Sequence, residues 1–87
     1  MHATVVRVSI SDPEASEKRL KEEVVPTVSQ APGFVAGYWT REGNNGQSMV
    51  VFESEQAARA AADRVPQMLP EGVTLDSIEV RKVVASA

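Results

Sequence analysis

The stretch FVAGYWTREGNNGQSMVVFE, residues 34–53, decides the fold of this chain. At its centre lies Gly43-Asn44-Asn45-Gly46, and Asn and Gly tolerate the positive φ angles of tight turns. The flanking residues 34–42 and 47–53 are rich in β-branched and aromatic side chains, which favour strands. We therefore expect an antiparallel β-hairpin, with Asn44 and Asn45 serving as turn formers.

Two further strands are expected near the ends of the chain. Residues 3–10, ATVVRVSI, and residues 73–84, VTLDSIEVRKVV, have the β-branched density of strands. The hairpin lies between them in sequence, so four strands are expected in all.

A first helix is expected between the opening strand and the hairpin. It follows SDPE, residues 11–14, which offers capping residues and a proline suited to a first turn. Leu20, Val24 and Val28 then recur at a spacing of four and form a narrow apolar stripe. Pro26 lies within this pattern and should loosen the helix near Glu22, whose carbonyl loses its donor.

A second helix, EQAARAAADRV (residues 55–65), is expected after the capping residue Ser54, with Pro66 and Pro70 followed by Gly72 closing it. The full order is β-α-β-β-α-β. With right-handed crossovers it gives a four-stranded antiparallel sheet with both helices on one face. We therefore expect a single α+β domain, residues 1–87, with a ferredoxin-like arrangement.

Composition narrows the classes of function. The chain has 87 residues, no cysteine, one histidine and a net charge of −3 with mixed signs. No thiolate site, carboxylate cluster of metal-binding spacing or basic run is present, so we expect no metal, no cofactor and no nucleic acid. Neither a secretory leader nor an apolar run long enough to span a membrane is present, so a soluble, cytoplasmic protein is expected.

The two helices cover one face of the expected sheet. The opposite face should carry Trp39, Met49 and Val51, together with charges of both signs, and it is too apolar to leave in water. A domain of this size without disulfides is also marginally stable alone. We therefore expect a homodimer in which two sheets pack face to face.

The β-α-β-β-α-β order, the PGF that enters the second strand and MVVFESEQAARAAA (residues 49–62) resemble the dimeric α+β barrel superfamily. Within it, the small proteins of the antibiotic-biosynthesis-monooxygenase type are most similar. The superfamily includes cofactor-independent monooxygenases, haem-degrading enzymes and stress-response proteins. The resemblance implies a paired barrel with the chain's own copy as partner.

The family's catalytic positions are not matched here. Phe52 stands where oxygenases of this type typically place a Trp. The helix after it has Ala61, Ala62, Asp63 and Arg64 where the haem-degrading members place a His, and residues 5–7 lack their Asn. These departures argue against haem degradation and weaken, without removing, the implication of oxygenase chemistry.

A cavity between sheet and helices is the candidate site. Its expected lining residues are Phe34, Tyr38, Phe52, Leu20, Val24 and Val28. Adjacent strand residues face opposite ways, so Tyr38 is expected toward the helices and Trp39 toward the dimer interface. Alternatively, the alanine-rich helix packs closely on the sheet and these side chains fill the space.

Charged residues supply further candidates. Arg7 and Arg41 either contact an anionic ligand or pair across strands with Glu53 or Glu79. His2 is expected to be solvated, or ordered only at an interface, because it lies at the chain terminus.

Two functions follow from the sequence. In the first, a homodimer without catalysis binds a small apolar or aromatic ligand or acts as a stress or interaction module. In the second, a cofactor-independent monooxygenase acts on an aromatic, polyketide-like substrate. Fold alone supports neither, because function depends on the site.

Overall fold

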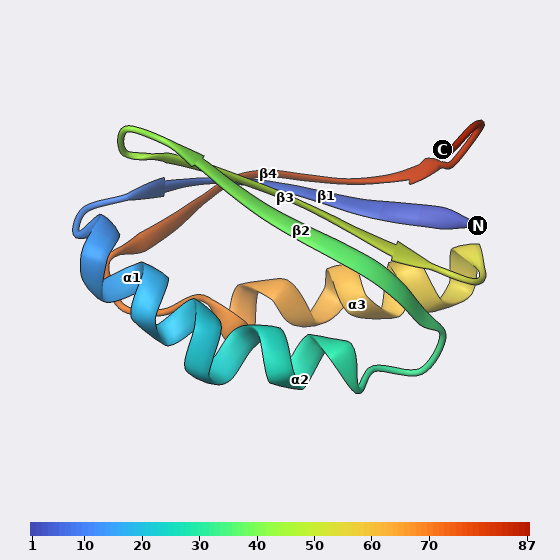
Figure 1. Cartoon of the computed structure of the whole chain (residues 1–87), viewed down its shortest axis with the longest axis horizontal. Helices are drawn as coiled ribbons and strands as arrows, with labels where there is room; N and C mark the ends of the chain where they lie inside the picture. The colour runs from blue at the N-terminus through green and yellow to red at the C-terminus, as the bar shows by residue number, and fades with distance from the viewer.

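In the computed structural model, which describes residues 1–87, four strands form one antiparallel sheet in the order β2-β3-β1-β4. The strands are β1 (His2–Ile10), β2 (Phe34–Glu42), β3 (Asn45–Phe52) and β4 (Val73–Lys82). All helices lie on one side of this sheet, and the other side is open (Figure 1). The predicted ferredoxin-like α+β fold is confirmed.

The helical layer has two parts. The first is a continuous segment made of α1 (Pro13–Arg19), the π-helical η1 (Leu20–Val24) and α2 (Val25–Ser29). The second is α3 (Glu55–Met68). Figure 1 shows the two parts side by side beneath the sheet. None of these helices has both the length and the apolar composition that crossing a bilayer requires.

The π-helical turn lies where Pro26 was expected to disturb the first helix. Proline has no N–H to give to the carbonyl of Glu22, and its ring crowds that carbonyl. The backbone N–H of Val25 donates to the carbonyl of Leu20, five residues earlier, so the turn before the proline is widened. The helix resumes beyond it as α2.

Side-chain caps begin α1 and α3. The Asp12 side chain accepts from the N–H of Ala15 at 3.3 Å, and the Ser54 hydroxyl accepts from the N–H of Ala57 at 3.1 Å. α3 ends at Met68, between the two prolines, Pro66 and Pro70, that were expected to close it. A proline in the last turn removes one hydrogen bond near the helix end, where few others depend on it.

The hairpin turn is confirmed at Gly43 and Asn44 and also anchors the first strand, whereas Asn45, also expected in the turn, begins β3 and pairs with Glu42. Gly43 has φ 59°, which glycine adopts without steric cost at the first central position of a tight hairpin turn. The Asn44 side chain donates to the carbonyl of Ile10 at 2.7 Å, and the N–H of Ile10 donates to the Asn44 carbonyl at 2.8 Å. The turn therefore closes the end of β1 as well.

A bulge in β2 reverses the faces expected for the aromatic pair. Phe34 pairs with Phe52, but the register shifts before Ala36, so that Trp39 pairs with Ser48. An extra residue in one strand moves every later side chain to the opposite face. The expected faces of Tyr38 and Trp39 are therefore wrong, because Tyr38 is 68% exposed on the open face and Trp39 packs against the core.

The core lies at the end of the molecule where β3 meets α3. Phe52 is 1% exposed and Ala58 is fully buried. The Phe34 ring packs edge-on against Phe52, with the two ring centroids 6.3 Å apart. The Thr4 hydroxyl donates to the carbonyl of Ala58 at 2.8 Å and so fixes α3 to β1. At this end the alanines do let the helix approach closely.

Candidate ligand-binding cavity

A cavity of about 640 Å³ lies between the sheet and the helical layer. Its floor consists of strand side chains: Thr4, Val6, Val8 and Ile10 of β1, Trp39 of β2, and Ser48, Val50 and Phe52 of β3. Its walls are Leu20, Val24 and Val28 of the first helical segment, then Ala61, Val65, Met68 and Leu69 of α3 and the residue after it. This volume is within the range that small-molecule pockets occupy.

The cavity is open because the two helical parts contact the sheet differently. α3 packs on β1, β3 and β4, whereas α2 packs on β2. No residue between Pro13 and Ser29 is buried. The side of α3 that faces the first helical segment carries Ala57, Ala60 and Ala61, whose short side chains leave the space between the helices unfilled.

Four of the six residues predicted to line the cavity do so. Leu20, Val24, Val28 and Phe52 lie along it. Phe34 instead packs against Phe52 within the core. The sixth, Tyr38, lies on the opposite face of the sheet, because the bulge in β2 reverses the side-chain alternation.

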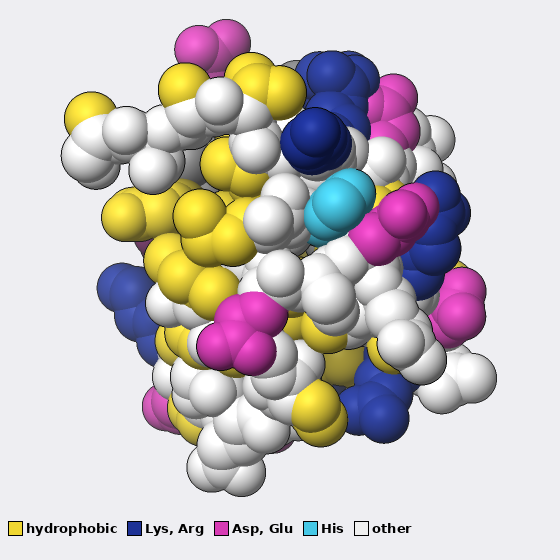
Figure 2. All heavy atoms as spheres, turned by 90° about the vertical axis from the view of Figure 1, so that its right-hand side faces the viewer, with side chains coloured by type: hydrophobic (Ala, Val, Ile, Leu, Met, Phe, Trp, Pro, Cys, Tyr) yellow, Lys and Arg dark blue, Asp and Glu magenta, His cyan; other side chains and the backbone are white.

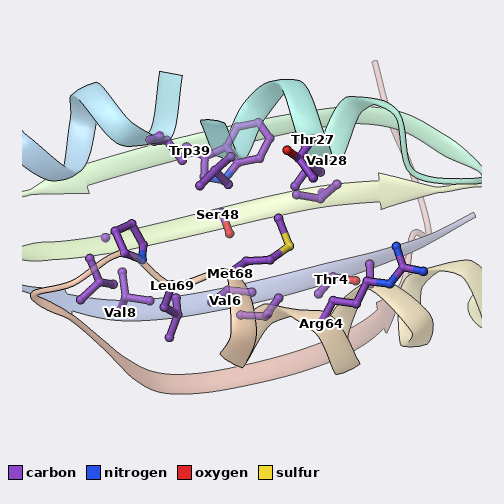
Figure 3. Close-up of a pocket in the computed structure, with 18 of the residues that line it drawn as sticks. Thr4, Val6, Val8, Thr27, Val28, Trp39, Ser48, Arg64, Met68 and Leu69 are labelled. Atoms are coloured by element: carbon purple, nitrogen blue, oxygen red, sulfur yellow. The ribbon is translucent and has the colours of Figure 1, made fainter. Parts of the chain in front are cut away.

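Trp39, which has the largest side chain lining the cavity, was expected on the other face of the sheet. A Cβ atom placed on Gly37 would meet Cη2 and Cζ3 of the indole ring at 2.9 Å, so the ring lies directly over this glycine. Figure 3 shows Trp39 on one side of the cavity, with Val6, Met68 and Leu69 on the other. In the sequence, Gly37 could have indicated this placement of Trp39, because a glycine two positions earlier leaves room for the ring on the same face of the strand.

Two polar groups on neighbouring strands face the same space. The Trp39 indole N–H and the Ser48 hydroxyl belong to directly paired residues, and Figure 3 draws both at the cavity. Neither group takes part in a side-chain hydrogen bond within the chain. Both can therefore donate to an oxygen atom of a bound molecule.

The two predicted anion contacts, Arg7 and Arg41, lie near the hairpin, where both line a second, polar pocket. Arg7 lies on the open face, where its Nε donates to the Gln47 side chain at 3.4 Å. Arg41 reaches the cavity, and its Nη1 donates to the carbonyl of Gly43 at 2.9 Å. Arg64 of α3 also lines the cavity, a position that the sequence pattern does not predict.

A small polar cluster lies outside the cavity, at the start of α3. Two nitrogens of Arg59 donate to one Glu55 carboxylate oxygen, at 2.8 and 3.0 Å. This hydrogen bonding, and then the positive charge of Arg59, lowers the pKa of Glu55. Figure 2 shows the single histidine, His2, beside an acidic side chain, and its Nε2 is 4.0 Å from Glu55.

His2 is the first residue of β1 and is less exposed than its terminal position suggested. Its side chain is 24% exposed, and its Nδ1 atom is buried without a hydrogen-bond partner. It does not line the cavity. No three side chains among His, Asp and Glu come together as metal ligands would.

Neither a protein-family model nor a curated protein matches this sequence. The function is therefore inferred from the cavity and from the open face of the sheet.

Proposed function

We propose that this protein binds a small apolar or aromatic molecule in the cavity between its sheet and its helices. The observation that carries the proposal is the space of about 640 Å³ walled mainly by aliphatic side chains and the Trp39 ring. Removing apolar ligand surface from water there would stabilise a complex by about 25 cal/mol per Å² before the costs of association are subtracted. The Trp39 N–H and the Ser48 hydroxyl would orient a ligand that carries an oxygen atom.

The same proposal includes a homodimer formed through the open face. Val35, Tyr38 and Met49 are 46%, 68% and 44% exposed on this face, and Val51 lies beside them. Apolar side chains gathered on one sheet face favour covering by another apolar surface. A second copy packed sheet to sheet would cover them, as the resemblance to the dimeric α+β barrel superfamily implies. Tyr38 would then occupy the interface in place of Trp39.

A cofactor-independent monooxygenase acting on an aromatic, polyketide-like substrate is the second candidate. The observation that favours it is the pair of donors, Trp39 and Ser48, within an apolar cavity. Such donors could hold the oxygen of an ionised phenol where little water competes. Oxygen consumption with electron-rich naphthols, measured with an oxygen electrode, would support this candidate over binding alone.

Fluorescence tests the binding proposal. The probe is N-phenylnaphthylamine, an uncharged aromatic molecule whose absorption overlaps tryptophan emission. Trp39 is the only tryptophan, so saturable energy transfer from it reports binding of the probe to the chain. We expect saturable transfer with micromolar affinity, roughly −8 kcal/mol.

A matched pair of variants locates the probe. Val24 is half-buried at the cavity wall, whereas Val84 is 88% exposed in the C-terminal tail. Val24→Phe should narrow the cavity and weaken binding by about tenfold, and Val84→Phe should leave it unchanged. Equal affinities for both variants would contradict the proposed site.

A further inference from the structure

We propose that the natural ligand of the cavity is an anion, an apolar molecule with a carboxylate or similar group, and that Arg64 binds its charge. This inference rests on the proposed binding function and names the class of ligand. Arg64 of α3 lines the cavity, and in the view of Figure 3 its side chain extends past Thr4, away from Met68.

Arg64 is the cation that the fold leaves without a partner at this site. Of the side chains lining the cavity, only Arg41 and Arg64 are basic. Arg41 donates to the carbonyl of Gly43. Arg64 forms neither an ion pair nor a side-chain hydrogen bond within the chain.

Other arginines on the helices and on β4 differ from Arg64 in this respect. Arg19 pairs with Glu23, Arg59 pairs with Glu55, and Arg81 pairs with Glu79. Each of these carboxylates lies on the same element as its arginine or on the helical turn that follows it. Arg64 has no such acid paired with it, so its guanidinium is free to donate to a ligand.

The surroundings of Arg64 define what the rest of the ligand must be. Met68 lies one turn further along α3, and Val24 and Val28 line the cavity from the facing helical segment. A charged group held by Arg64 would therefore continue into an apolar body. A guanidinium binds carboxylate, sulfonate or phosphate oxygens in pairs, which fixes the orientation of such a molecule at the cavity mouth.

Two probes that share one aromatic body test this inference. Anilinonaphthalene sulfonate carries a negative charge, and N-phenylnaphthylamine lacks it. We predict that Arg64→Gln lowers the affinity for the sulfonate probe by about tenfold and leaves the affinity for the uncharged probe unchanged. Arg64→Lys should restore part of the loss, because a lysine keeps the charge without the planar fork.

Arg59→Gln is the matched control, since it removes a cation from the same helix at a residue that does not line the cavity. It should change the affinity of neither probe. Arg64→Gln could leave sulfonate binding unaltered or lower the affinity for both probes equally. Either result would contradict an anion site at Arg64. Binding of the uncharged probe would still support a ligand in the cavity. If neither probe binds the unaltered protein, the proposed function falls together with this inference.

Discussion

Gly37 and Trp39 together shape one wall of the cavity. The indole ring occupies the place that a side chain at residue 37 would need, as the 2.9 Å separation from an added Cβ shows. Contacts this short require one of the two groups to move. The residue pair therefore couples a small change on β2 to the volume available for a ligand.

Gly37→Ala should displace the Trp39 ring and destabilise the fold by about 1–3 kcal/mol, the usual cost of overpacking. We expect a lower urea midpoint, a shifted tryptophan emission maximum and weaker probe binding. In a Trp39→Leu background the same alanine should cost much less stability, because the ring is absent. An equal loss of stability in both backgrounds would contradict the proposed contact.

Glu55 and Arg59 provide a pH-dependent contribution to stability. Hydrogen bonding and charge from Arg59, with a smaller contribution from His2, hold the pKa of Glu55 below its usual range in the folded chain. The pairing therefore stabilises the fold at pH values above the unfolded pKa. This stabilisation is lost as the pH falls through the lowered folded pKa.

Arg59→Gln should therefore reduce stability at pH 7 but have a smaller effect below about pH 4, where the carboxyl of the unfolded chain is protonated. Urea denaturation of both proteins across this range measures the difference. The effect should be small, since the pair is on the surface, and it should shrink further in high salt. A difference that grows in acid would contradict this assignment.

At the scale of elements, the Thr4–Ala58 hydrogen bond joins α3 to the central strand β1. Thr4 is 2% exposed, so its hydroxyl is removed from water as well as bonded. Thr4→Val should keep the shape of the side chain and destabilise the protein by about 1 kcal/mol. Thr74→Val on the exposed side of β4 is the control, and it should change the urea midpoint far less.

The order of elements was predictable because turn residues, caps and β-branched runs act locally. Gly43, Ser54 and the strand patterns predicted their elements directly. The bulge near Ala36 could not be read in this way, because one extra residue in a strand leaves the composition of that strand unchanged. It exchanged Tyr38 and Trp39 between the two faces.

The candidate site was predictable only in part, because some of its residues are placed by local patterns and others by the packing of distant elements. The helical stripe of Leu20, Val24 and Val28 has a spacing that defines its face, and all three residues line the cavity. Arg64 has no pattern that points toward a cavity, because it follows a run of alanines and an aspartate on a helix whose outer face is also charged. Its position depends on the distance between two helices, which local sequence does not encode.

At the scale of the whole molecule, the open face predicts association. Light scattering after size exclusion at micromolar concentration should give twice the chain mass of 9.4 kDa. Met49→Lys would place a charge among the apolar side chains of this face and should give the mass of a monomer. Gln56→Lys, on the exposed side of α3, is the control and should leave the dimer intact. A monomer for the unaltered protein would contradict the paired-sheet proposal.

The central claim is that a small apolar molecule binds between the sheet and the helices. Amide and methyl NMR spectra recorded during titration with N-phenylnaphthylamine test it most directly. We predict saturable shifts for cavity residues such as Val6, Val8 and Val24, and much smaller shifts for Val35 and Met49 on the open face. Shifts confined to the open face, or no shifts at saturating probe, would contradict the claim.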